Sequence, residues 1–579
     1  MSGASPGEAA SASEAEPTAA SKSSDPPPPP LLEPSTRGRF AVTVALFASV
    51  LTLLVTTCSG LGYARDEGFY FEAARAYGKW FELFVSDRAT ALQRPATDAA
   101  FGVNHEHPAL IKSLFALSNL GLERKWHVFD EPGTSFRFPA MVLAALLIAS
   151  VYRWGERRFG RAAGLVGALS LLFAPRFFYH AHLACFDVPI AAMFFFTVLA
   201  YSRAVSTEGS YWPLVTGLLF GLSLDTKHNS WFLPFVVLTH LVVLGTNAWL
   251  RRERVWPSIH RSAMTLVSMA LVGPIVVFVL WPWLWHDTLT RVADYARFHL
   301  QHEYYNMELF GRTYWEPPMP RSYAWVMTLA TVPIVTLVAG AIGAARSLFT
   351  AAKQTRAREP LEHGGEPLLW GIAVLVCYAP WLRDSTPIFG GTKHWMTAYP
   401  FLALFVASGF EASILATRKL VAALRNGWFA YVVALVVLAP SVRESLHAHP
   451  WGLGAYTPLV GGTPGAASLG LNRSFWGYNT GAVVDYLNRE VPEGGRVYIH
   501  DTAWPSWEML QEDGRLRPDI RAVSAVSSAD FALYHHEQHM QGEEYQAWVA
   551  FGTVRPDLVR GLDGVPTISV YRRSSAGTR

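Results

Sequence analysis

Apolar runs of helical length recur along the chain from residue 40 to residue 441, separated by polar loops. A helix needs roughly 20 apolar residues to cross the hydrocarbon core of a bilayer, and about eleven runs come close to that length. They lie near residues 40–62, 136–154, 160–175, 185–202, 211–224, 230–250, 263–284, 323–345, 367–382, 395–415 and 427–441. The third and fifth runs are the weakest, so the count is approximate. The pattern predicts an all-α polytopic membrane protein.

The two ends of the chain differ in composition from this apolar middle. Residues 1–36 are rich in Ser, Ala, Glu and Pro and cannot bury a core, so we expect a disordered tail. Residues 37–441 form the predicted transmembrane domain. Residues 442–579 are polar, and their pattern predicts a small α/β domain outside the membrane. The strand-like pieces are 497–500, 531–534 and 567–571, and the helix-like piece is 480–489.

Basic residues gather in every second loop, and by the positive-inside rule these loops are cytoplasmic. The N-terminus is then inside, and an odd number of spans places the C-terminal domain outside. The basic residues are Arg37 and Arg39, then Arg153, Arg157, Arg158 and Arg161, then Arg251, Arg252, Arg254 and Arg261, then Arg346, Lys353, Arg356 and Arg358, and finally Arg418, Lys419 and Arg425. Usage rich in Ala, Arg and Pro favours a bacterial plasma membrane.

The bulk composition agrees with a membrane protein and excludes other classes. Hydrophobic residues make up 51% of the chain and charged residues only 16%, where a soluble protein carries about a quarter charged residues. A net charge of +3 without a dense basic stripe argues against a nucleic-acid partner. The 3 cysteines give neither a disulfide framework nor a CxxC zinc pattern.

The loops that face outward in this topology are rich in ionisable residues beside Trp and Tyr. Such groups at the rim of a membrane protein suggest a functional site, although any one of them could be ordinary loop decoration. Three outer segments have the pattern of helices that lie on the membrane surface. These segments are 66–84, 107–121 and 286–305.

Two motifs in the first outer loop carry candidate chemistry. Asp66 and Glu67 follow the first span, where a carboxylate could take a proton from an acceptor hydroxyl. The alternative is that both only stabilise the first turn of a helix. Further along, the stretch Asn104-His105-Glu106-His107-Pro108-Ala109-Leu110-Ile111-Lys112 could contact a phosphate or a sugar, or could simply be a polar loop that enters a helix.

The order of these motifs resembles the protein O-mannosyltransferases and their bacterial relatives. That family has the C-type fold of membrane glycosyltransferases, which also includes the lipid A aminoarabinose transferase. Further matching stretches are His180 to Pro189, Gly221 to His228, and Lys393-His394-Trp395 through Tyr399-Pro400. The likeness extends over roughly residues 40–415. The chain departs from the family in having His107-Pro108-Ala109 instead of HPP, and in lacking an inserted β-trefoil module.

The resemblance implies a glycosyltransferase that moves a hexosyl or pentosyl group from a polyprenyl-phosphate donor to a protein, lipid or glycan hydroxyl on the outer face of the membrane. Asp66 would then be the catalytic base, supported by Glu67. The implied sugar or acceptor ligands are Asp187, His105 and His107. The implied ligands of the donor phosphate are Lys227, His228, Lys393, His394 and Lys112.

No cofactor is required on this hypothesis, because the leaving phosphate already carries charge; a divalent metal is possible but not indicated. A zinc site at His535, His536 and His539 is conceivable, but no fourth ligand is evident. Two other functions stay open. The chain could be a transporter or flippase of a lipid-linked glycan, although such proteins place ionisable groups near the bilayer midplane. It could also be a scaffold with an inactive site.

Overall fold

The computed structural model describes residues 36–207, 211–388, 390–421 and 426–574. The tail predicted for residues 1–36 lies outside these ranges except for its last residue, Thr36, where the first helix begins.

Within the described residues, nine helices are long and apolar enough to cross a membrane. Two shorter apolar helices, α7 (Arg161–Leu172) and α10 (Trp212–Leu224), correspond to the third and fifth apolar runs. The spans are built on α1 (Thr36–Thr56), α6 (Pro132–Phe159), α9 (Asp187–Ser206), α11 (Leu233–Leu250), α12 (Val255–Leu280), α15 (Ile334–Ala357), α16 (Glu366–Tyr378), α17 (Tyr399–Leu420) and α18 (Gly427–Ala448). The predicted multi-pass helical membrane architecture is confirmed.

One predicted span is divided into two helices in the structure. The apolar run at 323–345 divides into α14 (Tyr323–Thr331) and α15, with Val332 and Pro333 between them. Proline has no backbone N–H and disfavours helical backbone in the residue before it, so the helix ends and restarts there. From this restart α15 continues to Ala357, well beyond the end of the predicted run.

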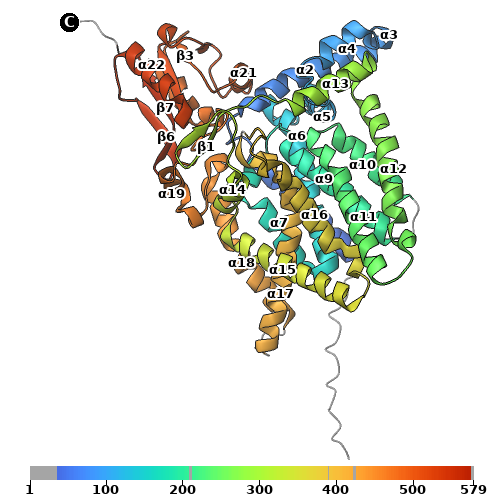
Figure 1. Cartoon of the computed structure of the whole chain (residues 1–579). Helices are drawn as coiled ribbons and strands as arrows, with labels where there is room; N and C mark the ends of the chain where they lie inside the picture. The colour runs from blue at the N-terminus through green and yellow to red at the C-terminus, as the bar shows by residue number, and fades with distance from the viewer. Residues whose placement is uncertain (1–35, 208–210, 389, 422–425, 575–579) are drawn as a thin grey trace, which may run out of the picture.

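Short helices cover one end of the bundle. The segments predicted as surface helices form α2 (Arg65–Ser86), α5 (Leu110–Ser118) and α13 (Thr288–Leu300). Between and around them lie α3 (Arg88–Ala91), α4 (Arg94–Phe101), α8 (Pro175–His180) and the hairpin of β1 (Met307–Leu309) and β2 (Arg312–Tyr314). Figure 1 shows α2, α4, α5 and α13 grouped at this end, while the junction of α11 and α12 lies at the other. The basic segments that carry Arg158 and Arg346 line a shared cavity away from these helices.

The C-terminal region contains a five-stranded sheet with the strand order β4-β3-β5-β7-β6. Its strands are β3 (Arg496–Tyr498), β4 (Arg521–Val523), β5 (Phe531–His535), β6 (Leu558–Leu562) and β7 (Val565–Arg572). The first three pair in parallel and β7 pairs antiparallel to both of its neighbours. The accompanying helices are α19 (Gly462–Ser468), α20 (Val484–Glu490), α21 (Trp504–Glu512) and α22 (Gln541–Phe551). The predicted small α/β region is therefore present, and the predicted boundary at 441 falls inside α18.

This C-terminal region packs directly against the loop that follows α1 and against α2 (Figure 1). The Arg515 guanidinium donates to the Leu61 carbonyl at 2.7 Å, and the Trp476 carbonyl accepts from the Arg65 amide at 2.8 Å. At Gly62 the two backbones come so close that a Cβ would lie 2.2 Å from the Tyr478 carbonyl oxygen. Glycine at this position lets the sheet-bearing region dock beside the start of α2.

Candidate active site

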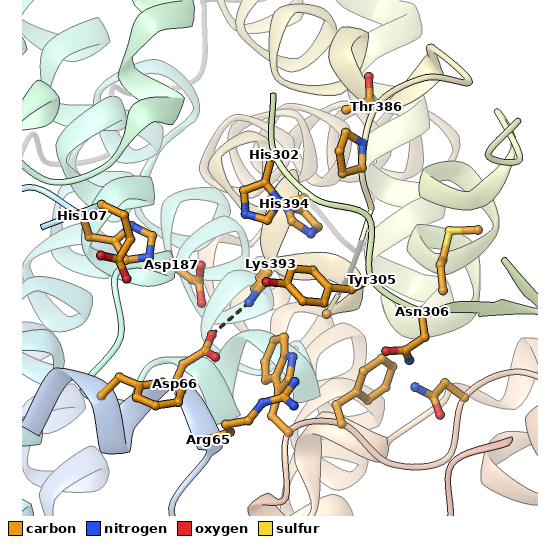
Figure 2. Close-up of a pocket in the computed structure, with 18 of the residues that line it drawn as sticks. Arg65, Asp66, His107, Asp187, His302, Tyr305, Asn306, Thr386, Lys393 and His394 are labelled. Carbon is orange, nitrogen blue, oxygen red and sulfur yellow. Dashed lines mark hydrogen bonds and ion pairs between the residues drawn. The ribbon is translucent and has the colours of Figure 1, made fainter. Parts of the chain in front are cut away.

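A cavity of about 450 Å³ lies where the short helices at one end of the bundle meet the C-terminal region. Figure 2 shows Asp66, Asp187 and Lys393 pointing into it, with Asn306 on the far side. Seven of the ten residues predicted for the site line this cavity, although they come from five separate stretches of the chain. They are Asp66, His107, Asp187, Lys227, His228, Lys393 and His394.

Asp66 enters the cavity from the first turn of α2 and is held by a lysine far away in sequence. The Lys393 ammonium lies 3.0 Å from Asp66 Oδ2 and 4.0 Å from the centre of the Trp476 ring. The Asp66 side chain is 25% exposed, whereas that of Lys393 is only 6% exposed. The carboxylate is therefore accessible from the cavity, while its cationic partner is almost fully buried.

A second carboxylate–lysine pair lies on the wall formed by the membrane helices. Asp187 begins α9, and the Lys227 ammonium donates to Asp187 Oδ1 at 2.7 Å. The side chains are 6% and 12% exposed, and His180 Nδ1 lies 3.6 Å from the other carboxylate oxygen. Each of two ammonium groups at the cavity is thus paired with a carboxylate.

Several histidine rings also line the cavity. The rings of His228 and His299 stack with their centres 4.1 Å apart, and His107 lies edge-on to Tyr70 at 5.8 Å. Burial lowers the pKa of His107 well below its usual range, and burial likewise lowers the pKa of His299 to about 4. These two rings are therefore neutral near pH 7 and act as hydrogen-bonding groups.

Three predicted site residues do not line the cavity. Glu67 is fully buried and accepts hydrogen bonds from Arg137 Nε and Nη2, both at 2.7 Å, and from the amides of Ala64 and Ala184 at 3.0 and 2.9 Å. Its carboxylate thus ties α2 to α6 and to the loop before α9, and it has no access to a substrate in the cavity.

Lys112 and His105 have local structural contacts. The Lys112 ammonium donates to the carbonyls of Asn104 and His107 at 2.5 and 2.8 Å, which fixes the loop that carries His107. Burial lowers the pKa of Lys112 to about 7. His105 is exposed and packs on Trp283, with ring centres 4.8 Å apart.

The structure adds residues that sequence analysis did not single out. Arg65, directly before Asp66, forms an ion pair with Asp501 of the C-terminal region at 3.4 Å. The hairpin strand β1 supplies Glu308, which lies 3.0 Å from His539 Nδ1. The other additions from the C-terminal region are Asn472, Phe475, Trp476, Glu537 and Met540, and His539, which the sequence suggested only as a zinc ligand, lines the cavity with them. A polar segment with several His residues was the only signal in the sequence, and it does not indicate which wall they face.

The suggested zinc site does not form in the described part of the chain. His535 is buried in β5 beside His500, whereas His536 bonds the Ser569 hydroxyl at 2.8 Å and His539 bonds Glu308. Across the described residues, no group of three or more His, Cys, Asp or Glu side chains has the arrangement of a metal site.

Residues 123–281 match the sequence model of a family described as dolichyl-phosphate-mannose-protein mannosyltransferase. No curated protein matches the chain in sequence. Among solved structures, ArnT from Cupriavidus metallidurans in the apo state is similar, with 16% identity, 93% of this chain and 100% of that chain covered, and a TM-score of 0.45. The oligosaccharyltransferase of Archaeoglobus fulgidus in complex with Zn and sulfate has 11% identity over 88% of this chain and 70% of that chain, with a TM-score of 0.46.

The segment that matches the family runs from the short helical segment after α5 to the residue after α12 and contains two of the cavity's charged groups, Asp187 and Lys227. The predicted relationship to the protein mannosyltransferases is therefore confirmed over this segment.

Proposed function

We propose that the chain is a glycosyltransferase that moves a sugar from a polyprenyl-phosphate donor to an acceptor hydroxyl. The observation that carries this proposal is the cavity itself, in which a partly exposed carboxylate, Asp66, faces two buried ammonium groups. The description of the matching family, which names dolichyl phosphate mannose, supports a lipid phosphate as the leaving group.

The basic wall suits a phosphate whose negative charge grows as the sugar leaves. Ammonium groups that are fixed before the reaction stabilise such charge without reorganisation. Lys393 and Lys227 supply them, and His228 and His394 lie in the same wall. Both lysines are paired with a carboxylate in the described structure, so a bound phosphate would share each ammonium with Asp66 or Asp187.

Asp66 is the group we propose as general base. It is the carboxylate at the start of α2 that reaches the cavity, and its oxygen Oδ2 is already held by Lys393. An acceptor hydroxyl placed against the free oxygen would lose its proton to Asp66 as it attacks the anomeric carbon. Glu67 is instead a positioning residue, because its four hydrogen bonds anchor the turn that carries Asp66.

The location of the cavity favours transfer over transport. Its walls are the short helices, the ends of the membrane helices beside Asp187 and Lys227, the β1 hairpin and the C-terminal region, all at one end of the spans (Figure 1). A transport site is expected near the middle of the spans. With the basic loops on the cytoplasmic side, the cavity and the C-terminal region would face outward from a bacterial plasma membrane.

The test is transfer by the purified full-length protein in liposomes supplied with labelled polyprenyl-phosphate sugars and a membrane extract. Label should move to an acceptor with the wild-type protein and not with the Asp66→Asn variant. Movement of the lipid-linked sugar across the bilayer without transfer would favour the flippase. Binding of the donor with neither event would contradict the enzyme proposal for every acceptor class present in the extract.

A further inference from the structure

The cavity has an acidic wall that the proposed transfer chemistry leaves unexplained. Glu308 of β1, Asp501 after β3 and Glu537 after β5 all line it, and their side chains are 3%, 1% and 5% exposed. This wall is built entirely by the hairpin and the C-terminal region. It therefore lies apart from the pair of Asp187 and Lys227, which the membrane helices supply.

Several hydrogen-bond acceptors in this wall have no donor. Among the described residues, neither carboxylate oxygen of Asp501 has a hydrogen-bond partner, although Arg65 lies 3.4 Å away, and Glu537 Oε1 and the amide oxygen of Asn472 also have none. Asn472 is 5% exposed and lines the same cavity. Buried acceptors without donors are destabilising, so a ligand that brings donors would be stabilised here.

These hydrogen-bond acceptors favour an organic cation as the ligand. The described residues contain no three-ligand cluster suited to a metal ion. A primary ammonium carries one charge and three hydrogen-bond donors that can point to separate acceptors. Burial, with Asp501 and Glu308 nearby, raises the pKa of Glu537 well above its usual range. Arrival of an ammonium would favour the ionised form of Glu537, so that binding would release a proton.

A second cavity adjoins the acidic wall and would admit such a ligand. It has a volume of about 590 Å³ and shares Glu308 and Glu537 with the first cavity. Its other walls all come from the C-terminal region, including Arg473 near α19, Tyr534 and Trp548. None of its lining residues belongs to a membrane span, so this route suits a water-soluble acceptor and not the prenyl donor.

We propose that Asn472, Asp501, Glu537 and Glu308 form an acceptor subsite for a primary ammonium group, entered from the second cavity. This inference rests on the proposed transferase function, since it names one feature of the acceptor used at the same site. The ion pair between Arg65 and Asp501 joins the subsite to Asp66, the adjacent residue. An acceptor could therefore place its amine on the acidic wall and its hydroxyl at the base.

The test compares glucosamine, N-acetylglucosamine and glucose as probes of the full-length protein in lipid nanodiscs, with binding followed by calorimetry near pH 7. Glucosamine should bind at least about tenfold more tightly than either neutral sugar, the size of one charge-assisted hydrogen bond. The Glu537→Gln variant should remove most of this preference. Glu512→Gln is the matched control, because Glu512 pairs with Arg75 on the surface of the same region, outside the first cavity.

Three outcomes would overturn the subsite. Equal binding of the three sugars would mean that the acidic wall binds sugar hydroxyls and not an ammonium group. A preference for glucosamine that survives in Glu537→Gln would locate the amine elsewhere. Displacement of glucosamine by polyprenyl-phosphate glucose, but not by polyprenyl phosphate alone, would place the amine in the donor-sugar position. Failure of the transferase proposal is a separate result, because it appears in the liposome transfer assay and leaves these binding measurements unchanged.

Discussion

Replacing Glu67 by Gln should destabilise the protein without a specific chemical defect. Both carboxylate oxygens accept one bond from Arg137 and one from a backbone amide, so all four partners are donors. In either orientation a Gln side chain places its NH₂ group against two of these donors. The substitution therefore leaves donors without an acceptor and a buried guanidinium, 1% exposed, without its counter-charge.

The expected loss of stability is about 3–5 kcal/mol, the range found when one partner of a buried ion pair is removed. Thermal unfolding of purified protein in the same detergent measures it. Glu72→Gln is the control, because Glu72 is an exposed residue on the same helix, and its change should stay within about 0.5 kcal/mol. A Glu67→Gln variant with wild-type stability and lost turnover would refute this reasoning and return Glu67 to the catalytic machinery.

Three further substitutions test the site. Asp66→Asn should lower turnover by about 10²–10⁴-fold, the share of a general base, with unchanged binding of polyprenyl phosphate; near-normal turnover would remove Asp66 from the role of base. Lys227→Ala should weaken binding of polyprenyl phosphate by about tenfold or more, and unchanged binding and rate would mark a structural lysine. Burial lowers the pKa of Lys112 from 10.5 to about 7. Between these two pH values the unfolded chain therefore holds one more proton than the folded chain. The free energy of unfolding should then rise with pH, by at most about 1.4 kcal/mol per pH unit. Lys112→Gln should flatten that rise between pH 7.5 and 9, and equal pH slopes for the two proteins would contradict it.

The sequence alone was sufficient for the membrane architecture, because apolar runs of spanning length determine it directly. Even the two short runs at 160–175 and 211–224 became the short helices α7 and α10. The run at 323–345 was different, since its hydropathy is continuous across Pro333 while the backbone is not. Hydropathy reports where a chain is apolar, and the break in the helix depends on one missing N–H group.

The candidate site was only partly predictable, and the reason is visible at Asp66 and Glu67. Adjacent residues on a helix point about 100° apart, so one of the pair faces the cavity and the other faces the bundle interior. The residue that faces the interior is Glu67, because it binds Arg137 of α6, which lies 70 positions away in the sequence. The sequence identifies both carboxylates as candidates for the base. The contact with Arg137 that keeps Glu67 away from the cavity is a tertiary contact, which the sequence pattern does not show.

The acidic wall could not be predicted from the sequence, because it also depends on tertiary contacts. Glu308, Asp501 and Glu537 lie in three different stretches, each of which resembles an ordinary polar loop or strand end. They meet because Gly62 lets the C-terminal region dock on the loop before Asp66, and because Arg65 then pairs with Asp501. The residues that precede the base therefore also locate the C-terminal region. A change in that docking contact should disturb the acidic wall and the position of Asp66 together, whereas the pair of Asp187 and Lys227 would keep its geometry.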